Sequence, residues 1–126
     1  MSTILVNTLT GTSTAGSIAV TGEGNSTTTN LQQGLVKAWA ETNGSGTTIR
    51  DSFNIASLED TASGRQTCNY TNDFASDNNT VVTTGQTVGS NMVFSATSSG
   101  NWIVYSFNGT SYGDMAMSTI AAGDLA

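Results

Sequence analysis

The residues that could carry out covalent chemistry are few in this chain. Residues 109–113 read GTSYG and match the G-x-S-x-G pattern around the nucleophile of many serine hydrolases. In those enzymes a histidine activates the serine, and this sequence contains no histidine. Gly and Ser are also frequent throughout the chain, so we interpret the pattern as a turn and expect no catalytic residue.

Acidic side chains offer two further kinds of chemistry. Paired carboxylates could cleave a glycan if they lay roughly 5–9 Å apart in a cleft. The Asp- and Asn-rich run at residues 73–79 could supply oxygen ligands to calcium, although its spacing matches no EF-hand loop. We expect solvated turn residues in both cases, and therefore no metal site and no cofactor. The carboxylates considered for glycan cleavage are Asp51, Glu59, Asp60, Asp73, Asp77 and Asp114.

Glycan binding, unlike cleavage, needs only exposed aromatic side chains beside polar ones. Trp102, Tyr105 and Tyr112 lie in the C-terminal part of the chain and are the candidate glycan or receptor contacts. Each could instead belong to the core. Strand alternation places Trp102 and Val104 on one face and Tyr105 on the other. We expect a core position for Trp102 and leave Tyr112, which follows a turn, open between the two roles.

Charge disfavours two classes of partner. The net charge is −6, and Lys37, Arg50 and Arg65 are the only basic residues. Nucleic acids and anionic lipids bind basic surfaces, so neither is expected as a partner. The sequence has no run of about 18 apolar residues that could span a membrane. Because the first residues lack a basic segment followed by an apolar run, no signal peptide is expected.

The composition predicts an all-β protein with a thin core. About half of the residues are Thr, Ser, Asn or Gly, which favour strands and tight turns over helices. A chain of this size buries only about two thirds of its unfolded surface, and this one is low in Leu and aromatic residues. Burial against sister subunits would compensate, so we expect an oligomer. Cys68 is the only cysteine and is expected to be a free, buried thiol, with a bond between subunits as the alternative.

The order of apolar runs and turns predicts an N-terminal segment and a head. Residues 1–30 contain short β-type runs at 4–6 and 17–21 and then a polar linker. Residues 31–126 are predicted to form an antiparallel β-sandwich, because strand patterns alternate with turn signals every 8–12 residues. A stripe formed by Leu31, Leu35 and Trp39 is expected to lie in the core of the oligomer. The predicted strands of the head lie near residues 36–41, 49–58, 67–71, 81–84, 92–97, 102–107 and 110–121.

One segment of the head resembles a known module. Residues 37–39 read KAW, residues 43–47 read NGSGT, residues 49–54 read IRDSFN, residues 64–70 read GRQTCNY, and the chain ends in GDLA. This pattern, with the opening ILVNTL, resembles bacteriophage virion fibre proteins.

The resemblance implies a short homotrimeric tail fibre that adheres to a host-surface glycan. Its N-terminal segment would join other virion proteins, and assembly would take place in the bacterial cytoplasm. Two alternatives remain: a capsid-bound head fibre or decoration protein with a purely structural role, and a polysaccharide depolymerase.

Overall fold

The structure is a computed structural model that describes residues 3–12, 18–21, 28–31, 34–44, 47–86, 92–107 and 109–126, with the backbone alone at 92–94. The chain divides into two units, Met1–Leu35 and Val36–Ala126, so the division falls five residues later than the sequence interpretation placed it. The described residues form strands, turns and loops without any helix, and hence without any helix that could cross a membrane.

The N-terminal unit contains one short hairpin. Strand β1 (Ala19–Thr21) pairs antiparallel with β2 (Thr28–Asn30), which lies inside the segment expected to be a linker. The β-type run at residues 4–6 does not form a strand, and its apolar side chains are exposed. A strand needs a neighbour to satisfy its backbone donors and acceptors, and no described segment pairs with this run. That strand prediction is therefore wrong for the single chain.

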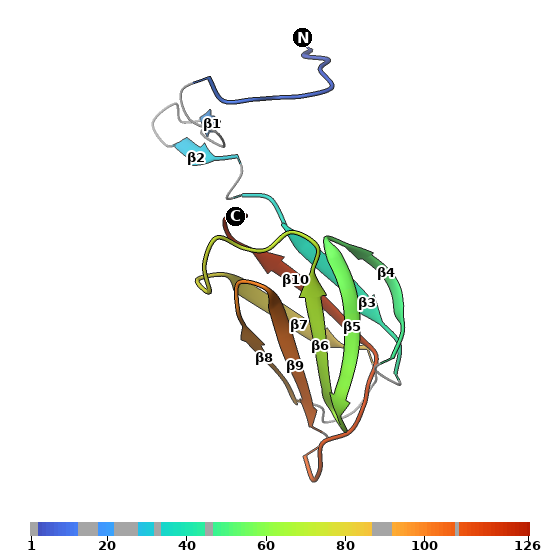
Figure 1. The fold of residues 1–126 in the computed structure, drawn as a ribbon. Coiled ribbons are helices and arrows are strands. Elements are labelled where there is room, and N and C mark those ends of the chain that lie inside the picture. Colours follow the sequence, from blue (N-terminus) through green and yellow to red (C-terminus); the bar gives the residue numbers. More distant parts are fainter. Residues whose placement is uncertain are drawn as a thin grey trace. The chain divides into compact units, whose positions relative to one another are not determined.

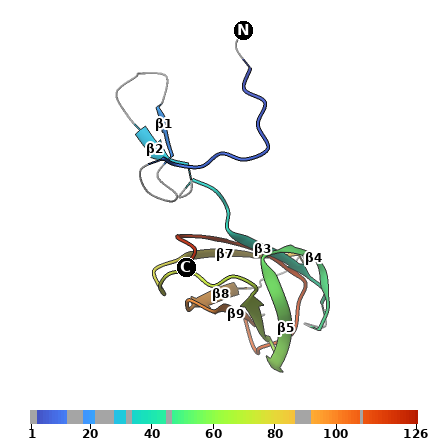
Figure 2. The same ribbon diagram turned by 45° about the horizontal axis from the view of Figure 1, so that its top comes forward.

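The head, Val36–Ala126, is an antiparallel β-sandwich of two four-stranded sheets, which confirms the predicted fold class. Figures 1 and 2 show the two sheets facing each other. The first sheet has the order β4-β3-β10-β7, and its strands are Ile49–Phe53, Ala38–Thr42, Met117–Ala122 and Thr80–Gly85. The second sheet has the order β5-β6-β9-β8, and its strands are Ile55–Ala62, Arg65–Tyr70, Asn101–Phe107 and Met92–Thr97.

Alternation along the central strands explains why the two sheets pack together. In β9 every second residue is buried, and Trp102 and Val104 face the interior while Tyr105 faces outward. Strand β3 alternates in the same way, with Ala38, Ala40 and Thr42 buried. A strand with one apolar side and one polar side is stable only when the apolar side is covered. The predicted strands near 36–41, 67–71, 81–84, 92–97 and 102–107 are confirmed as β3, β6, β7, β8 and β9.

The core between the sheets is built around three aromatic rings. The ring of Tyr70 meets Phe74 and Trp102 edge to face, with centroid distances of 4.8 and 5.3 Å. Such pairs add roughly 0.5–1.5 kcal/mol to the effect of burial. The remaining buried apolar side chains are mostly small or sulfur-containing: Ala38, Ala40, Cys68, Val104, Met115, Met117 and Ala121. The first sheet contributes mainly alanine, so the core is thin on that side.

Buried polar groups also link the two sheets. The hydroxyl of Thr42 on β3 donates to Oε1 of Gln66 on β6 at 3.0 Å. The amide of Gln66 in turn donates to the backbone carbonyl of Met115 at 3.1 Å. Gln66 is almost fully buried, and these bonds satisfy polar atoms that would be costly to bury alone. They therefore help to fix how β3 and the segment before β10 lie against β6.

The sequence predicts one strand over residues 49–58, and the structure corrects this. Asn54 has a φ of 60°, so the chain turns there and β4 joins the first sheet while β5 joins the second. Asn is one of the few residue types that tolerate a left-handed conformation. Its side chain is fixed by Asn72, whose backbone N–H donates to Oδ1 of Asn54 at 2.8 Å. Asn54 Nδ2 donates to the Asn72 carbonyl at 3.0 Å.

The last predicted strand, residues 110–121, is also corrected. Strand β10 begins only at Met117 and belongs to the first sheet, whereas β9 belongs to the second. The segment between them must therefore cross from one sheet to the other and cannot pair along its length. Of the Asn-Gly turn expected at residues 108–109, Asn108 lies outside the described residues, and Gly109 has the positive φ of such a turn, 91°. The GTSYG motif lies in this crossing loop.

The turn at Asn54 gives a first prediction. Replacing Asn54 with Ala should lower the free energy of unfolding by about 2 kcal/mol, because it adds left-handed strain and removes the bonds to Asn72. Asn54→Gly removes the same bonds without the strain and should cost about 1 kcal/mol less than the alanine variant. Urea denaturation measures both values. Equal losses for the two variants would show that the positive φ carries no cost.

Burial of Cys68 gives a second prediction. The thiol is free and buried, as predicted, and burial raises its pKa to about 12, with a smaller opposing effect from Trp102. At neutral pH the folded protein therefore holds an unreactive thiol, because the thiolate is the nucleophile. Alkylation by iodoacetamide at pH 8 should be many-fold slower in the native protein than in urea. Equal rates would contradict this burial.

Candidate functional site

Four large apolar side chains lie in one line across the outer face of the first sheet. The strand register places Phe53 of β4 opposite Trp39 of β3, and Trp39 opposite Ile120 of β10, which is opposite Val82 of β7. Phe53, Ile120 and Val82 are each about half exposed, and Trp39 is partly buried. We call these four residues the apolar row. An exposed apolar stripe of this kind on a small domain often marks a binding surface.

A line of polar side chains runs beside the apolar row. The same register aligns Asp51, Glu41, Ser118 and Thr84 across the four strands. Residues directly opposite one another in an antiparallel pair project from the same face of the sheet. These four residues, the polar row, therefore share the outer face with the apolar row.

The two rows meet in a hollow of about 270 Å³ over β3, β10 and β7. Its volume lies just below the range of roughly 300–1,000 Å³ that is usual for small-molecule sites, which suits a single small ring. The residues that line the hollow are Trp39, Ala40, Glu41, Val82, Thr84, Ser118, Thr119 and Ile120. The surface of the hollow is therefore mainly apolar, and the Glu41 carboxylate and the hydroxyls of Thr84 and Ser118 are the polar groups of the polar row that line it.

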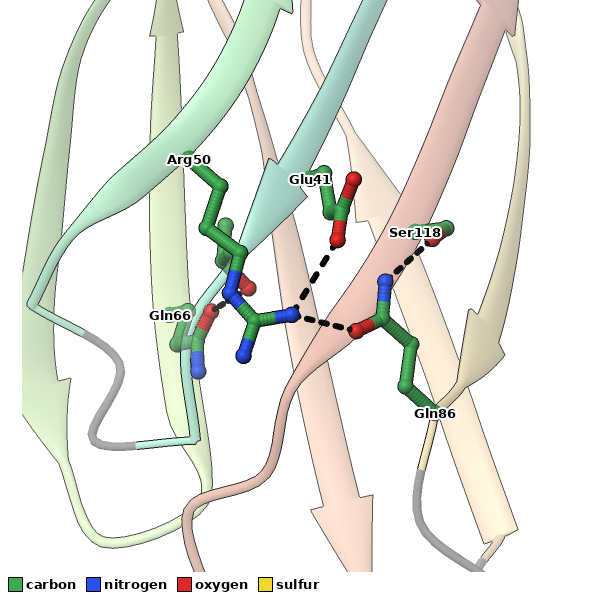
Figure 3. Close-up of polar contacts among 6 residues, drawn as sticks. Glu41, Arg50, Gln66, Gln86 and Ser118 are labelled. Atoms are coloured by element: carbon green, nitrogen blue, oxygen red, sulfur yellow. Dashed lines mark hydrogen bonds and ion pairs between the residues drawn. The ribbon is translucent and has the colours of Figure 1, made fainter.

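A chain of hydrogen bonds holds the polar edge of the hollow in place, and Figure 3 shows it from Arg50 to Ser118. Nη1 of Arg50 donates to Oε1 of Glu41 at 3.1 Å and to Oε1 of Gln86 at 3.0 Å. Nε2 of Gln86 then donates to the hydroxyl of Ser118 at 2.6 Å. Four side chains, from β4, β3, β10 and the residue that follows β7, are thus linked in one network.

A bulge brings Arg50 into this network. Glu41 pairs with Asp51 and Thr42 with Ile49, so Arg50 is the extra residue between the two pairs. A bulge of this kind redirects a side chain that would otherwise follow the alternation. Arg50 and Asp51 are neighbours in the sequence, but within the chain the ion pair of Arg50 is with Glu41.

The ion pair between Arg50 and Glu41 orients the Glu41 carboxylate and adds little to the free energy of unfolding. About half of the Arg50 side chain (50%) and 41% of the Glu41 side chain are exposed, and such pairs contribute roughly 0–1 kcal/mol. Arg50 does, however, fix one oxygen of the Glu41 carboxylate, and the second oxygen can accept a bond from a ligand. An aromatic platform beside fixed acceptors and hydroxyls is suited to binding a polar ring with apolar C–H groups.

The three aromatic residues singled out in the sequence lie elsewhere. Trp102 is 0% exposed and part of the core, so it cannot touch a ligand in the folded protein. Tyr105 is partly buried on the second sheet, with the Arg65 guanidinium 5.5 Å from its ring centroid. Tyr112 is 57% exposed and packs edge to face against Phe107. None of the three lines the hollow.

Most of the acidic candidates accept hydrogen bonds from other groups of the chain. Asp114 accepts from the backbone N–H of Gly64, and Asp77 accepts from that of Ser99. Within the 73–79 run the backbone N–H of Asn78 donates to the hydroxyl of Ser76 at 3.2 Å, a bond typical of polar turns. Among the residues that the structure describes, no three His, Cys, Asp or Glu side chains come close enough together to hold a metal ion.

The sequence pattern did not single out the hollow because strand register creates it. Trp39 and Glu41 belong to β3 and Ser118 belongs to β10, two strands far apart in the chain, and their neighbourhood depends on which strands pair. The one signal in the sequence was Trp39 itself, which was assigned to the core of an oligomer.

Comparison with protein-family models, with curated proteins and with solved structures gave no match.

The positions of the two tryptophans generate a third prediction. In a Trp39→Phe variant the remaining Trp102 should resist quenching by acrylamide, because it is fully buried. In a Trp102→Phe variant the remaining Trp39 should be quenched several-fold more strongly, because it lines an open hollow. Both should be quenched equally in urea, which serves as the control. Protection of Trp39 as strong as that of Trp102 would show that the face is covered in solution.

Proposed function

We propose that this protein is a short homotrimeric fibre of a bacteriophage virion and that its head adheres to a glycan on the host surface. The pattern of residues 37–70 and the closing GDLA, which resemble virion fibre proteins, support the class. The all-β sandwich head is compatible with it. The hollow beside Trp39 is the observation that carries the adhesive role.

Assembly is supported by the apolar residues of the N-terminal unit. Ile4, Leu5, Val6 and Leu9 are exposed in an extended segment that pairs with no other described residue. Burying these side chains against sister chains or another virion protein would remove apolar surface from water at about 25 cal/mol per Å². The thin core of the head indicates the same need for partners. The N-terminal segment is therefore the proposed site of trimerisation and attachment.

Adhesion fits the hollow because glycan recognition rests on shallow, open sites. A site of about 270 Å³ holds little of a long polymer, so a single copy would bind weakly. Three copies held together can engage a repetitive surface at once, and avidity then exceeds the affinity of each site by roughly 10²–10⁴. A trimer with one hollow per head is consistent with this arrangement.

Assembly is tested by size-exclusion chromatography with light scattering. The proposal predicts a mass about three times the 12.9 kDa of the chain. Replacing Leu5 and Leu9 with Ser should shift the protein toward smaller species, because it removes apolar surface from the proposed contact. A folded monomer at micromolar concentration that melts cooperatively at high temperature would contradict the proposal.

Adhesion is tested with Trp39→Ala, and Tyr112→Ala is the matched control because it removes an exposed aromatic outside the hollow. Attachment of the labelled protein to host cells should fall at least about tenfold for Trp39→Ala and stay within about twofold for the control. Host polysaccharide incubated with the protein should keep its chain length. Shortened chains would favour a depolymerase, and equal attachment by both variants would rule out the hollow as the site.

A further inference from the structure

The charges around the hollow select among glycans, and this inference rests on the proposed adhesive function. We infer that the hollow takes an uncharged sugar residue, with the apolar face of its ring on Trp39 and its hydroxyls on the polar row, and that it rejects acidic glycans.

The site carries more negative than positive charge. Glu41 and Asp51 are cross-strand partners at the rim, and Arg50 between them is the cation of this network. A carboxylate or sulfate on a sugar next to Arg50 would also lie near both acids. The wider head adds to this repulsion, because the whole chain has a net charge of −6.

The other two cations of the chain are Lys37 and Arg65. Lys37 is buried, with 6% of its surface exposed, and it lies two residues before Trp39. Arg65 belongs to β6 of the second sheet, where its guanidinium lies over Tyr105. Neither residue lines the hollow. The cation that is bonded to a lining residue is Arg50, through Glu41, and an acidic ligand would depend on it.

Arg50 is already paired with a carboxylate of this chain. One nitrogen, Nη1, donates to both Glu41 and Gln86, as Figure 3 shows. A ligand carboxylate that accepted from the other N–H groups of Arg50 would share the guanidinium with Glu41 and lie close to that negative charge. A neutral ligand meets no such repulsion. Arg50 is thus a positioning residue that fixes Glu41.

The open hydrogen-bonding groups match sugar hydroxyls. The second oxygen of Glu41 can accept from a hydroxyl, and a carboxylate is among the stronger acceptors. The hydroxyl of Ser118 accepts from Gln86, so its own hydrogen can be donated to a ligand oxygen. A sugar hydroxyl both donates and accepts, and two neighbouring hydroxyls could use both groups. An anionic group could not donate to Glu41.

The apolar row provides the other half of the recognition. A pyranose ring carries several C–H groups on one face, and Trp39 offers an aromatic surface on which they can pack. Ile120 and Val82 extend that surface across the hollow, and Phe53 continues it past Trp39 on the other side. One ring fits in the hollow, and the next rings of an oligosaccharide could follow the row.

The test is an NMR titration of the full-length, ¹⁵N-labelled protein with neutral trisaccharides (maltotriose, cellotriose, mannotriose) and with trigalacturonic acid as the acidic counterpart. We expect a neutral trisaccharide to bind and to shift the amide signals of residues 39–41 and 118–120. Its Kd should change less than about twofold between about 50 and 500 mM NaCl, because no ligand charge is involved. Trp39→Ala should abolish these shifts, and Tyr112→Ala should preserve them.

The variants at the ion pair separate this inference from the proposed function. Arg50→Gln should weaken neutral binding only a few-fold, whereas Glu41→Gln should weaken it by about tenfold through loss of a charged acceptor. Suppose that trigalacturonic acid binds, that the neutral trisaccharides do not, and that Arg50→Gln or added salt abolishes the binding. This inference is then overturned, whereas glycan adhesion as the proposed function is not. If no saccharide of either class binds while cell attachment still requires Trp39, both this inference and the glycan part of the proposed function are overturned.

Discussion

The left-handed turn at Asn54 decides how the head is divided. Without it, residues 49–62 could continue as a single strand, and one sheet would gain a strand that the other loses. With it, β4 forms an edge of the first sheet and β5 an edge of the second, and the hairpins β3-β4 and β5-β6 place the two sheets face to face. The hydrogen bonds between Asn54 and Asn72 hold this turn from a second part of the chain. The outer face of the first sheet exists in its present form because β4 ends there, with Phe53 as its last residue.

Much of the fold could be predicted from the sequence, because alternation of apolar and polar residues is a local signal. The composition gave the all-β class, and the strands around Trp102 and Val104 followed from their period of two. The errors occurred where tertiary structure overrides local pattern. Alternation over residues 49–58 continues smoothly through Asn54, and only the sandwich requires a turn there. The run at residues 4–6 has strand propensity, but a strand forms only where a partner lies beside it.

The candidate site was less predictable than the fold. Trp102 and Tyr112 drew attention as aromatic residues near turns, yet the structure buries the first and places the second away from the hollow. The hollow depends on two pairings, β3 with β10 and β10 with β7, that join residues about 80 and about 40 positions apart in the chain. The bulge that turns Arg50 toward Glu41 is equally invisible in the sequence, since it follows from a one-residue difference in register.

Strand alternation separates the surface of the first sheet from its interior. Trp39, Glu41, Ser118 and Ile120 point outward, while Ala38, Ala40, Met117 and Thr119 on the same strands are buried. Outward positions can therefore be exchanged with little effect on packing, because each lies between two residues that anchor the strand. Such a face can therefore be diversified while the scaffold is held constant. It is also a natural starting point for a randomised library in which new specificities are sought on an unchanged sandwich.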